Sequence, residues 1–420
     1  MAAVMLVTLS PTPRIARANQ AVSSMTPPTR ATKSWRSRRS PLEADGSMDG
    51  EADEVVMVLM VDGPEGGEVI CSVAGSGTPG SILRGTFLGI MRQVTVIGDG
   101  QFGLVLASLA ASRGHAVRLW GAFPQDLAAL ATTRRSPRLP DFDLDPAVTV
   151  EPDAERALAG AELCISAVPT QHLASVWTRL ASALPASTII VSVSKGLERG
   201  SLRRPSQIVK ESVPGHDVVS MSGPSIAAEM ARRLPLVMVV AGAPDATATV
   251  QDALSCSWLR LYTLRDHVGV ELAGAAKNVI ALAAGMLDGM RAGTNAKSAL
   301  LARGLAEIVR FGLAHGADAE TFFGVAGVGD LATTCFSPEG RNRSCGEALG
   351  RGQSLAEHLA HTRSVVEGVD TCDAIVRDAR SRGIELPIME AVHGVLFDGI
   401  APAQALQSLM SRDVGVERVR

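Results

Sequence analysis

The segment Val94-Thr-Val-Ile-Gly98-Asp-Gly100-Gln-Phe-Gly103 joins a short β-branched run to an Ala-rich amphipathic one, and its glycines follow the pattern G-x-G-x-x-G. Gly98 permits a tight turn, Gly100 lets a backbone approach a pyrophosphate, and Gly103 allows close packing of helix on strand. The helix that begins near Phe102 offers free N–H groups to that phosphate. In this strand–turn–helix context the segment predicts a dinucleotide site, with a plain tight turn as the alternative.

Apolar, β-branched runs alternate with longer Ala-rich segments from Met91 to about Asp266. The runs expected to form strands are residues 93–98, 116–120, 147–150, 163–169, 188–194, 218–222, 237–241 and 259–263. Strands that are buried on both faces and separated by helices predict a doubly wound parallel sheet. Beyond Asp266 the periodicity becomes helical, in residues 268–287, 296–315, 368–382 and 404–410. The predicted fold is therefore α/β then all-α: a Rossmann-type dinucleotide-binding domain over residues 93–266 and a helical domain over residues 267–420.

The N-terminal 92 residues differ from the rest in composition. Residues 1–42 hold seven Arg and Lys, many Ser and Thr, and no Asp or Glu, which is typical of an organelle transit peptide. A disordered basic arm and a wrongly assigned start codon are the alternatives. Residues 43–92 turn acidic and Gly-rich and are interpreted as a linker. Its apolar stretch 55–61 could form a strand, but no partner for that strand is evident.

Composition excludes several classes of protein. The 40 basic and 43 acidic residues give a net charge of −3, so no global field attracts nucleic acid. A 3% aromatic content with a single tyrosine argues against binding of single strands by stacking. The six cysteines form no C-x-x-C pair and are interpreted as reduced thiols, and no metal site is expected. No uninterrupted apolar run reaches the roughly 18 residues of a spanning helix, so membrane insertion is not expected.

The residues after the second expected strand bear on the choice between NAD and NADP. An acid there would bind the ribose of NAD, and a basic residue would suit the 2′-phosphate of NADP. Trp120 is followed by Gly121 and Ala122, so neither is present. Absence of the acid favours NADP slightly, and acceptance of both cofactors is predicted. Among the arginines that follow a helix later, Arg134 and Arg135 are alternative selectors or a solvated surface pair.

Polar residues that packing does not require follow two of the later strands. Lys195 comes after one strand, and Gly223 and Ser225 come after the next. The carboxyl ends of strands in an open sheet face the ligand crevice, so these residues are expected to line it.

Lys277 lies on an apolar helix, where no residue three or four positions away is a carboxylate. Burial would lower the pKa of its ammonium toward that of a useful acid. A lysine that extends to solvent from a helix end is an equal alternative. Asp330 follows a Gly-rich loop, and Arg341 and Asn342 beside a helix start predict a fork for phosphate or carboxylate, or else a surface loop.

At these residues the chain resembles the NAD(P)-dependent glycerol-3-phosphate dehydrogenases of the bacterial and plastid type. The motifs GDGQFG, SKGLE, SGPSIAAE, ELAGAAKN, GVGD, RNRS and VVEG occur in the family's order from about Gln93 to Asp413. The resemblance implies reversible reduction of dihydroxyacetone phosphate to sn-glycerol 3-phosphate with NADH or NADPH, for glycerolipid synthesis. It also implies an active site between the two domains. A homodimer in the plastid stroma, rather than in a mitochondrion, is expected, or a cytoplasmic enzyme if the N-terminus is no transit peptide.

The same motifs assign roles by position. Lys277 matches the proton donor, and Lys195 and Asp330 complete the predicted catalytic set. The positions matched to the cofactor are Gly98, Gly100, Gln101, Phe102, Gly103, Lys195, Ala227, Arg341, Val365 and Glu367. The positions matched to the substrate are Lys195, Gly223, Ser225, Lys277, Asp330, Gly340, Arg341 and Asn342.

Four positions depart from the family pattern. Asp99 and Gln101 stand where Ala and Ser are usual, and a carboxylate beside a pyrophosphate weakens binding unless it points away. Ala122 replaces a basic or imidazole side chain, and Gly340 replaces a serine hydroxyl. Two other functions remain open. Hydroxyacid or 6-phosphogluconate dehydrogenases share the two-domain plan and a helix-borne lysine, and a non-catalytic nucleotide sensor would share the fold alone. The RNRS and SKGLE motifs favour the phosphorylated triose.

Overall fold

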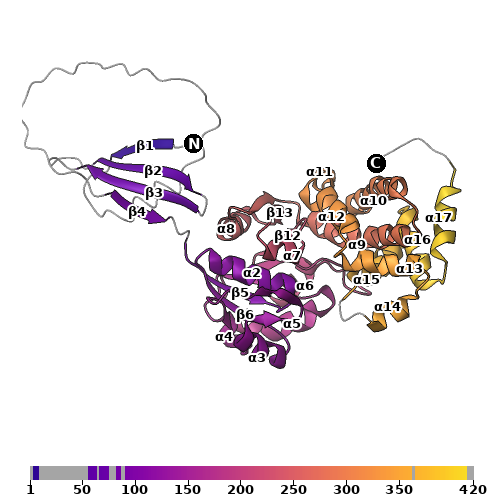
Figure 1. Ribbon diagram of the computed structural model, residues 1–420, viewed down its shortest axis with the longest axis horizontal. Helices are drawn as coiled ribbons and strands as arrows, with labels where there is room; N and C mark the ends of the chain where they lie inside the picture. The colour runs from indigo at the N-terminus through magenta and orange to yellow at the C-terminus, as the bar shows by residue number, and fades with distance from the viewer. Residues whose placement is uncertain are drawn as a thin grey trace, which may run out of the picture. The chain divides into compact units, whose positions relative to one another are not determined.

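The computed structural model describes residues 90–361 and 365–413, together with the backbone of four strands nearer the N-terminus. It divides into two compact units, Met1–Phe87 and Leu88–Arg420 (Figure 1). Every residue assigned to a site from the sequence belongs to the second unit.

The first unit contains an antiparallel sheet in the order β1-β2-β3-β4. Its strands are β1 (Ala3–Thr8), β2 (Val55–Gly63), β3 (Gly66–Ala74) and β4 (Ile82–Thr86). The strand expected near residues 55–61 is β2, and the expectation that it lacks a partner is wrong, because β1 and β3 flank it. The hairpin closes where Gly63 pairs with Gly66, so the glycines interpreted as linker instead end two strands. Residues 9–54, most of the predicted transit segment, lie outside the described residues.

The second unit begins with an eight-stranded sheet in the order β14-β13-β12-β11-β10-β5-β6-β9. Its strands are β5 (Gln93–Ile97), β6 (Ala116–Trp120), β9 (Thr149–Val150), β10 (Leu163–Ser166), β11 (Ile189–Ser192), β12 (Val218–Ser222), β13 (Leu236–Ala241) and β14 (Leu259–Leu264). All eight runs expected from the sequence form strands of this one sheet, and the predicted fold class is confirmed.

One pair departs from the expected parallel arrangement, since β12 and β13 are antiparallel. The helix between them, α7 (Ala227–Ala231), has only five residues. The 13 residues between β12 and β13 hold only this short helix, and the chain enters β13 in the opposite direction.

Helices cover both faces of the sheet. They are α2 (Gln101–Ser112), α3 (Pro124–Thr133), α4 (Ala154–Leu158), α5 (Leu173–Leu180), α6 (Pro205–Ser212) and α8 (Pro244–Leu254). Successive strand residues alternate between two cores: Val96 packs with residues of α2 and α8, and Ile97 packs with residues of α5 and α6. This alternation explains why the strands are apolar on both sides. The sequence did not predict the small hairpin of β7 (Arg135–Ser136) and β8 (Leu139–Asp143).

The rest of the second unit is helical and is built around α9 (His267–Gly289). The remaining helices are α10 (Thr294–Ala314), α11 (Ala319–Phe323), α12 (Asp330–Phe336), α13 (Arg341–Gly350), α14 (Leu355–His361), α15 (Glu367–Arg382), α16 (Pro387–Phe397) and α17 (Pro402–Met410). Among the helices that the structure describes, α9 is long and apolar enough to cross a membrane, although Glu271 and Lys277 interrupt its apolar residues, and its apolar window is entirely buried inside the structure.

Glycines bring α9 and α13 into backbone contact. A Cβ on Gly285 would lie 2.0 Å from the carbonyl oxygen of Arg343, and a Cβ on Gly346 would lie 2.0 Å from that of Leu282. No larger residue fits at either position without a shift of a helix. The contact holds the N-terminus of α13 beside the middle of α9.

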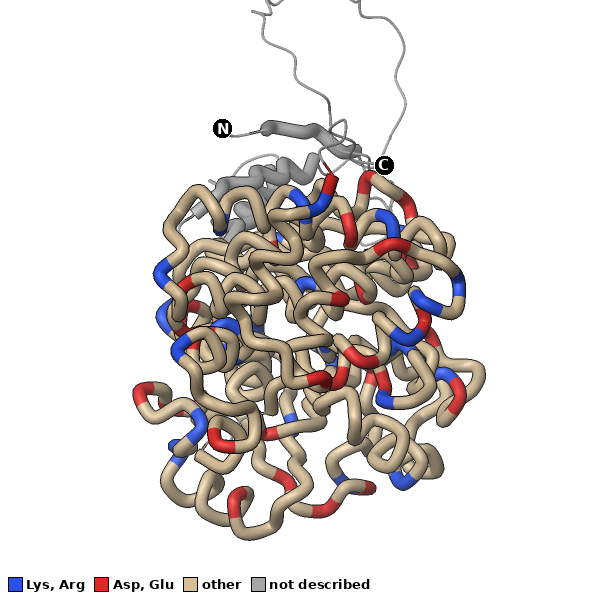
Figure 2. The backbone as a smooth tube through the Cα atoms, turned by 90° about the vertical axis from the view of Figure 1, so that its right-hand side faces the viewer, with Lys and Arg blue, Asp and Glu red and all other residues tan. Residues whose placement is uncertain are grey.

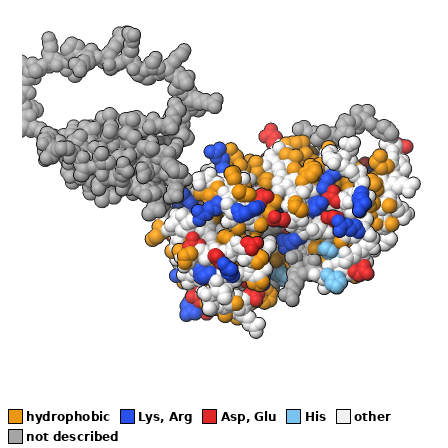
Figure 3. Space-filling view, in the orientation of Figure 1, with side chains coloured by type: hydrophobic (Ala, Val, Ile, Leu, Met, Phe, Trp, Pro, Cys, Tyr) orange, Lys and Arg blue, Asp and Glu red, His pale blue; other side chains and the backbone are white. Residues whose placement is uncertain are grey.

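Charges of both signs are interspersed along the backbone and over the visible face of the second unit (Figures 2 and 3). No block of one sign stands out in either view, in agreement with the small net charge of −3. The five cysteines of the described chain are unpaired, and its residues contain no cluster of three potential metal ligands.

Candidate active site

The glycine loop between β5 and α2 has the geometry of a dinucleotide site. Gly98 adopts a φ of +116°, and a Cβ there would lie 2.5 Å from the carbonyl oxygen of Ala167. A Cβ on Gly103 would lie 2.0 Å from the carbonyl oxygen of Gly98, whereas a Cβ on Gly100 would meet no atom within 4 Å. No side chain caps the N-terminus of α2. The loop thus combines a tight turn, an open backbone face and uncapped helical N–H groups, which fit a pyrophosphate.

Two lysines share one buried carboxylate. The Nζ atom of Lys195, which follows β11, donates to Asp330 Oδ2 at 2.8 Å. The Nζ atom of Lys277, in the middle of α9, donates to Asp330 Oδ1 at 2.7 Å. The side chain of Asp330 is only 2% exposed. A carboxylate bonded through both oxygens holds the two ammonium groups in fixed positions beside each other.

Lys195 also reaches the motif that follows β12. Lys195 Nζ donates to the carbonyl oxygen of Gly223 at 2.9 Å and to Ser225 Oγ at 3.3 Å. A cavity of about 400 Å³ adjoins Ser225 and is lined by residues of α7, β13 and α12. Five of the residues predicted from the sequence, from four separate segments, therefore meet in one place.

Local backbone features make this convergence possible. Asp330 begins α12 directly after a π-helical turn, Val325–Gly329, a conformation that recurs at functional sites. Gly327 in that turn has no room for a side chain, since a Cβ would lie 2.0 Å from the carbonyl oxygen of Phe322. The stem of Lys195 passes beside Gly274 of α9, where its Cγ would be in ordinary contact, at 3.7 Å, with a Cβ.

Burial lowers the pKa of Lys277 from its usual value to about 8. The Asp330 carboxylate acts in the opposite direction, and the positive charge of Lys195 lowers the pKa of Lys277 further. Glu367, the first residue of α15, faces the same groups. Burial raises its pKa to about 7, against the opposing effects of Arg341, Lys277 and Lys195. The site therefore holds an acid and a base that both titrate near neutral pH.

The start of α13 carries the residues predicted to form a fork. Gly340 is its N-cap, without a side-chain cap, and Arg341 is its first residue. Asn342 Oδ1 accepts a hydrogen bond from the N–H of Gly368 at 2.9 Å, which orients the amide group and leaves its N–H₂ to donate. Within the described part of the chain the exposed guanidinium of Arg341 has no hydrogen-bond or ion-pair partner. Free donors of this kind suit a phosphate.

Four other residues were matched to the cofactor from the sequence. Gln101 donates to the carbonyl oxygen of Arg138, and Phe102 packs partly buried against the core of the sheet. Ala227 is the first residue of α7, and Val365 is an exposed residue just before α15.

The sequence missed Thr334. Its hydroxyl accepts from Lys277 Nζ at 2.6 Å and donates to the carbonyl oxygen of Asp330 at 2.7 Å. The only signal was its position one helical turn after Asp330, and a threonine there is too common to be singled out.

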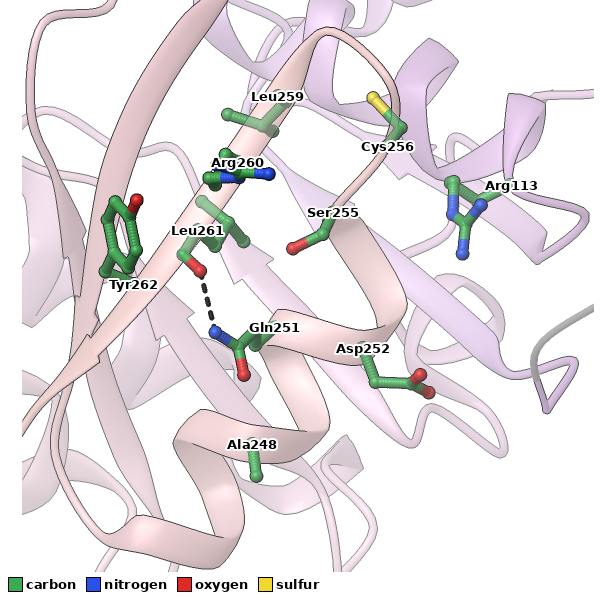
Figure 4. A pocket seen from close by; sticks show the side chains of 10 residues that line it. All are labelled: Arg113, Ala248, Gln251, Asp252, Ser255, Cys256, Leu259, Arg260, Leu261 and Tyr262. Atoms are coloured by element: carbon green, nitrogen blue, oxygen red, sulfur yellow. Dashed lines mark hydrogen bonds between the residues drawn. The ribbon is translucent and has the colours of Figure 1, made fainter. Parts of the chain in front are cut away.

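A cavity of about 520 Å³ lies between α8 and β14 (Figure 4). Gln251 of α8 and Leu261 both line it, and Gln251 donates to the carbonyl oxygen of Leu261 at 2.7 Å. It contains none of the residues predicted from the sequence, so the candidate site is the one around Asp330.

Comparison with known proteins agrees with this geometry. Residues 93–248 match the family model for the NAD-dependent glycerol-3-phosphate dehydrogenase N-terminus, and residues 266–407 match the model for its C-terminus. The chain belongs to the NAD-dependent glycerol-3-phosphate dehydrogenase family. The predicted resemblance is thus confirmed, and the family's cofactors are NAD and NADP.

Relatives in the family cover about three quarters of the chain. The chain is 43% identical to the glycerol-3-phosphate dehydrogenase [NAD(P)+] of Thermobifida fusca over 333 residues. The matched region spans 78% of this chain and 99% of that protein. The enzyme of Thermus thermophilus is 44% identical over 324 residues, 76% of this chain and 98% of its own. The crystal structure of glycerol-3-phosphate dehydrogenase from Coxiella burnetii superposes with a TM-score of 0.74 at 32% identity, covering 77% of this chain and all of the other.

Proposed function

We propose that this chain catalyses the reversible reduction of dihydroxyacetone phosphate to sn-glycerol 3-phosphate with NADH or NADPH. The observation that carries the proposal is the pair of lysines on one buried carboxylate, Asp330, in a family member whose glycine loop is intact. The family's name gives the substrate, and the site supplies the groups that such a reduction needs.

The glycine loop and the uncapped N-terminus of α2 would hold the pyrophosphate of the cofactor. When bound, the nicotinamide supplies the hydride, and the protein supplies position and charge. Arg341 and the amide of Asn342 would anchor the phosphate of the substrate, and this fixes its carbonyl group near the lysines. Both anchors lie on α13, which the glycine contact holds against α9.

Lys277 would donate a proton to the carbonyl oxygen as negative charge develops there, and it would recover the proton in the reverse direction. Asp330 holds its ammonium group through one oxygen and that of Lys195 through the other. Thr334 fixes Lys277 from a second side. Two held cations beside the reacting oxygen stabilise the developing alkoxide without reorganisation.

A spectrophotometric assay tests the function. We expect NADH or NADPH to be oxidised with dihydroxyacetone phosphate, and no reduction of NADP+ with 6-phosphogluconate or simple hydroxyacids. Turnover of the latter compounds in place of the triose phosphate would favour the alternative dehydrogenases. Binding of the cofactor without turnover of any of them would favour a nucleotide sensor.

Three wider proposals accompany the activity. The product would supply glycerol phosphate for phospholipid synthesis, the enzyme would act as a homodimer, and residues 1–42 would direct it to a plastid. The basic, acid-free composition of that segment supports the last proposal. Light scattering of the purified chain tests the dimer. Fluorescence of a fusion that carries residues 1–90 tests targeting, and fluorescence confined to the cytosol would contradict it. Suppression of phospholipid labelling in a deletion strain tests the lipid role.

A further inference from the structure

Asp99, the unusual residue of the glycine loop, places its carboxylate at the end of the second strand of the sheet. A Cβ on Gly121, directly after β6, would lie 2.7 Å from Asp99 Oδ1. In this fold a carboxylate at the end of that strand accepts from the ribose hydroxyls of NAD. The chain lacks such an acid after Trp120, but the side chain of Asp99 fills the space that Gly121 leaves. The carboxylate therefore reaches that position from the neighbouring loop.

Asp99 is held there by an arginine from the hairpin that the sequence did not predict. Arg138 donates to Asp99 Oδ2 at 2.9 Å through one terminal nitrogen and to Asp126 Oδ2 at 2.6 Å through the other. Gln101 also donates to the backbone carbonyl of Arg138, which ties the hairpin to the glycine loop. The Asp99 side chain is 10% exposed, so its remaining accepting capacity faces little water.

The other arginines near this strand are engaged elsewhere. Arg134 donates to the backbone carbonyls of Leu144, Asp145 and Val148, and Arg135 pairs with Asp143. Arg118 donates to the backbone carbonyls of Arg156 and Ala159. Among the described residues, Arg138 is thus the one arginine of these four that reaches the end of β6, and two carboxylates already share it.

We propose that Asp99 is a specificity-determining residue that makes this enzyme prefer NADH to NADPH, with Arg138 as its positioning residue. Two carboxylates against one guanidinium leave a net negative charge at this point. A 2′-phosphate would bring about two further negative charges to it, whereas a 2′-hydroxyl can donate to the carboxylate. The inference rests on the proposed function only in requiring a dinucleotide at the glycine loop, and it replaces the slight preference for NADP drawn from the sequence.

Binding titrations of each cofactor without substrate test the proposal. Binding is measured by the quenching of tryptophan fluorescence or by calorimetry. We expect the full chain to bind NADH roughly 10- to 100-fold more tightly than NADPH, the range for a hydrogen bond to a charged group. Asp99→Asn should reduce this ratio about tenfold or more, by weakening NADH and tightening NADPH. Arg138→Ala should weaken NADH without a selective loss of NADPH. Thermal melts of both variants check the fold, and Asp99→Ala serves if Asp99→Asn does not fold.

Asp143→Asn is the matched control, because it removes a carboxylate from an arginine pair in the same hairpin. It should leave the ratio unchanged. A wild-type affinity for NADPH equal to or above that for NADH would overturn the proposal, as would an unchanged ratio in Asp99→Asn. A loss confined to NADPH in Arg138→Ala would show that Arg138 binds the 2′-phosphate instead. Each of these three results would leave the proposed function intact if dihydroxyacetone phosphate is still reduced. Failure to bind NADH and NADPH would contradict both the cofactor preference and the proposed function.

Discussion

At the scale of single residues, Lys277 is the group on which the proposed chemistry depends. Replacing it in Lys277→Met removes the proton donor and the charge beside the reacting oxygen, while the methylene stem still fills the apolar environment. We expect kcat to fall about a hundredfold or more, the usual loss for a general acid, with the affinity for cofactor retained. Steady-state kinetics and a cofactor titration measure both. Lys210→Met, an exposed change on α6, is the control, and near-normal turnover of Lys277→Met would transfer the role to Lys195.

The pKa of about 8 for Lys277 predicts opposite pH profiles in the two directions. Reduction needs the protonated lysine, so its rate should fall as the pH rises through about 8, and oxidation needs the neutral lysine and should gain rate there. The groups that face the lysine are Asp330, Lys195, Glu367 and Cys335. Asp330→Asn removes the carboxylate that raises this pKa, so the limb should move to lower pH. A limb that stays at the same pH in this variant would mean that another group titrates.

Arg341 should act on binding rather than on proton transfer. Arg341→Ala removes a free guanidinium from the proposed phosphate anchor, and an interaction of equal strength in the ground and transition states changes KM and not kcat. We expect KM for dihydroxyacetone phosphate to rise by roughly 10- to 100-fold, the range for a hydrogen bond to a charged group. Arg341→Lys should recover part of it, because a lysine keeps the charge and loses the fork. An equal fall of kcat and kcat/KM would instead place Arg341 in the chemical step.

Part of this arrangement of residues could be predicted from the sequence. Lys195 and Lys277 could be singled out because a cation after a buried strand or inside an apolar helix needs a reason. Their pairing with Asp330 could not, since 135 and 53 residues separate the partners and only the fold joins them. Asp99 was noticed as a departure from the family pattern. The direction of its side chain, however, depends on the unpredicted hairpin that carries Arg138.

At the scale of elements, the contact between α9 and α13 positions the phosphate anchors. Gly346→Ala would place a methyl group 2.0 Å from a backbone oxygen of α9, so the helices must separate. We expect a loss of roughly 1–3 kcal/mol in the free energy of unfolding, the usual cost of overpacking. KM for the phosphorylated substrate should rise as well, because α13 carries Arg341 and Asn342. Thermal melts and kinetics measure the two effects, and Ser344→Ala on the exposed side of α13 is the control. An unchanged melting temperature would contradict the close contact.

The elements themselves were only partly predictable. Long segments with helical periodicity of apolar residues predicted α9, α10 and α15, and β-branched runs predicted all eight strands of the sheet. For the run RNRSCGEALG the sequence predicted a helix start near Arg341 but not the extent of the helix, because three of its residues are glycine or cysteine and its apolar face is narrow. It is helical because its glycines let it pack on α9, and tertiary packing of this kind outweighs local propensity. The antiparallel direction of β13 was missed because alternating strands and helices predict parallel strands, and the apolar run itself does not give its direction.

At the scale of the whole molecule, the proposed site belongs entirely to the second unit. The unit begins at Leu88, the family match begins at residue 93, and the site residues lie between Gly98 and Glu367. We therefore expect a chain of residues 90–420 to fold and to keep kcat/KM for dihydroxyacetone phosphate within about twofold, since no catalytic or binding group is removed.

Circular dichroism, thermal melting and the spectrophotometric assay on purified protein measure this outcome. A matched truncation that begins at residue 105 is the control, because it also removes β5 and the glycine loop. It should lose cofactor binding, because the truncation deletes both a central strand of the sheet and the turn proposed to hold the pyrophosphate. If the chain of residues 90–420 lost its fold or its activity, the sheet of the first unit would be part of the working enzyme, and the expectation that residues 1–89 are dispensable for activity would be wrong.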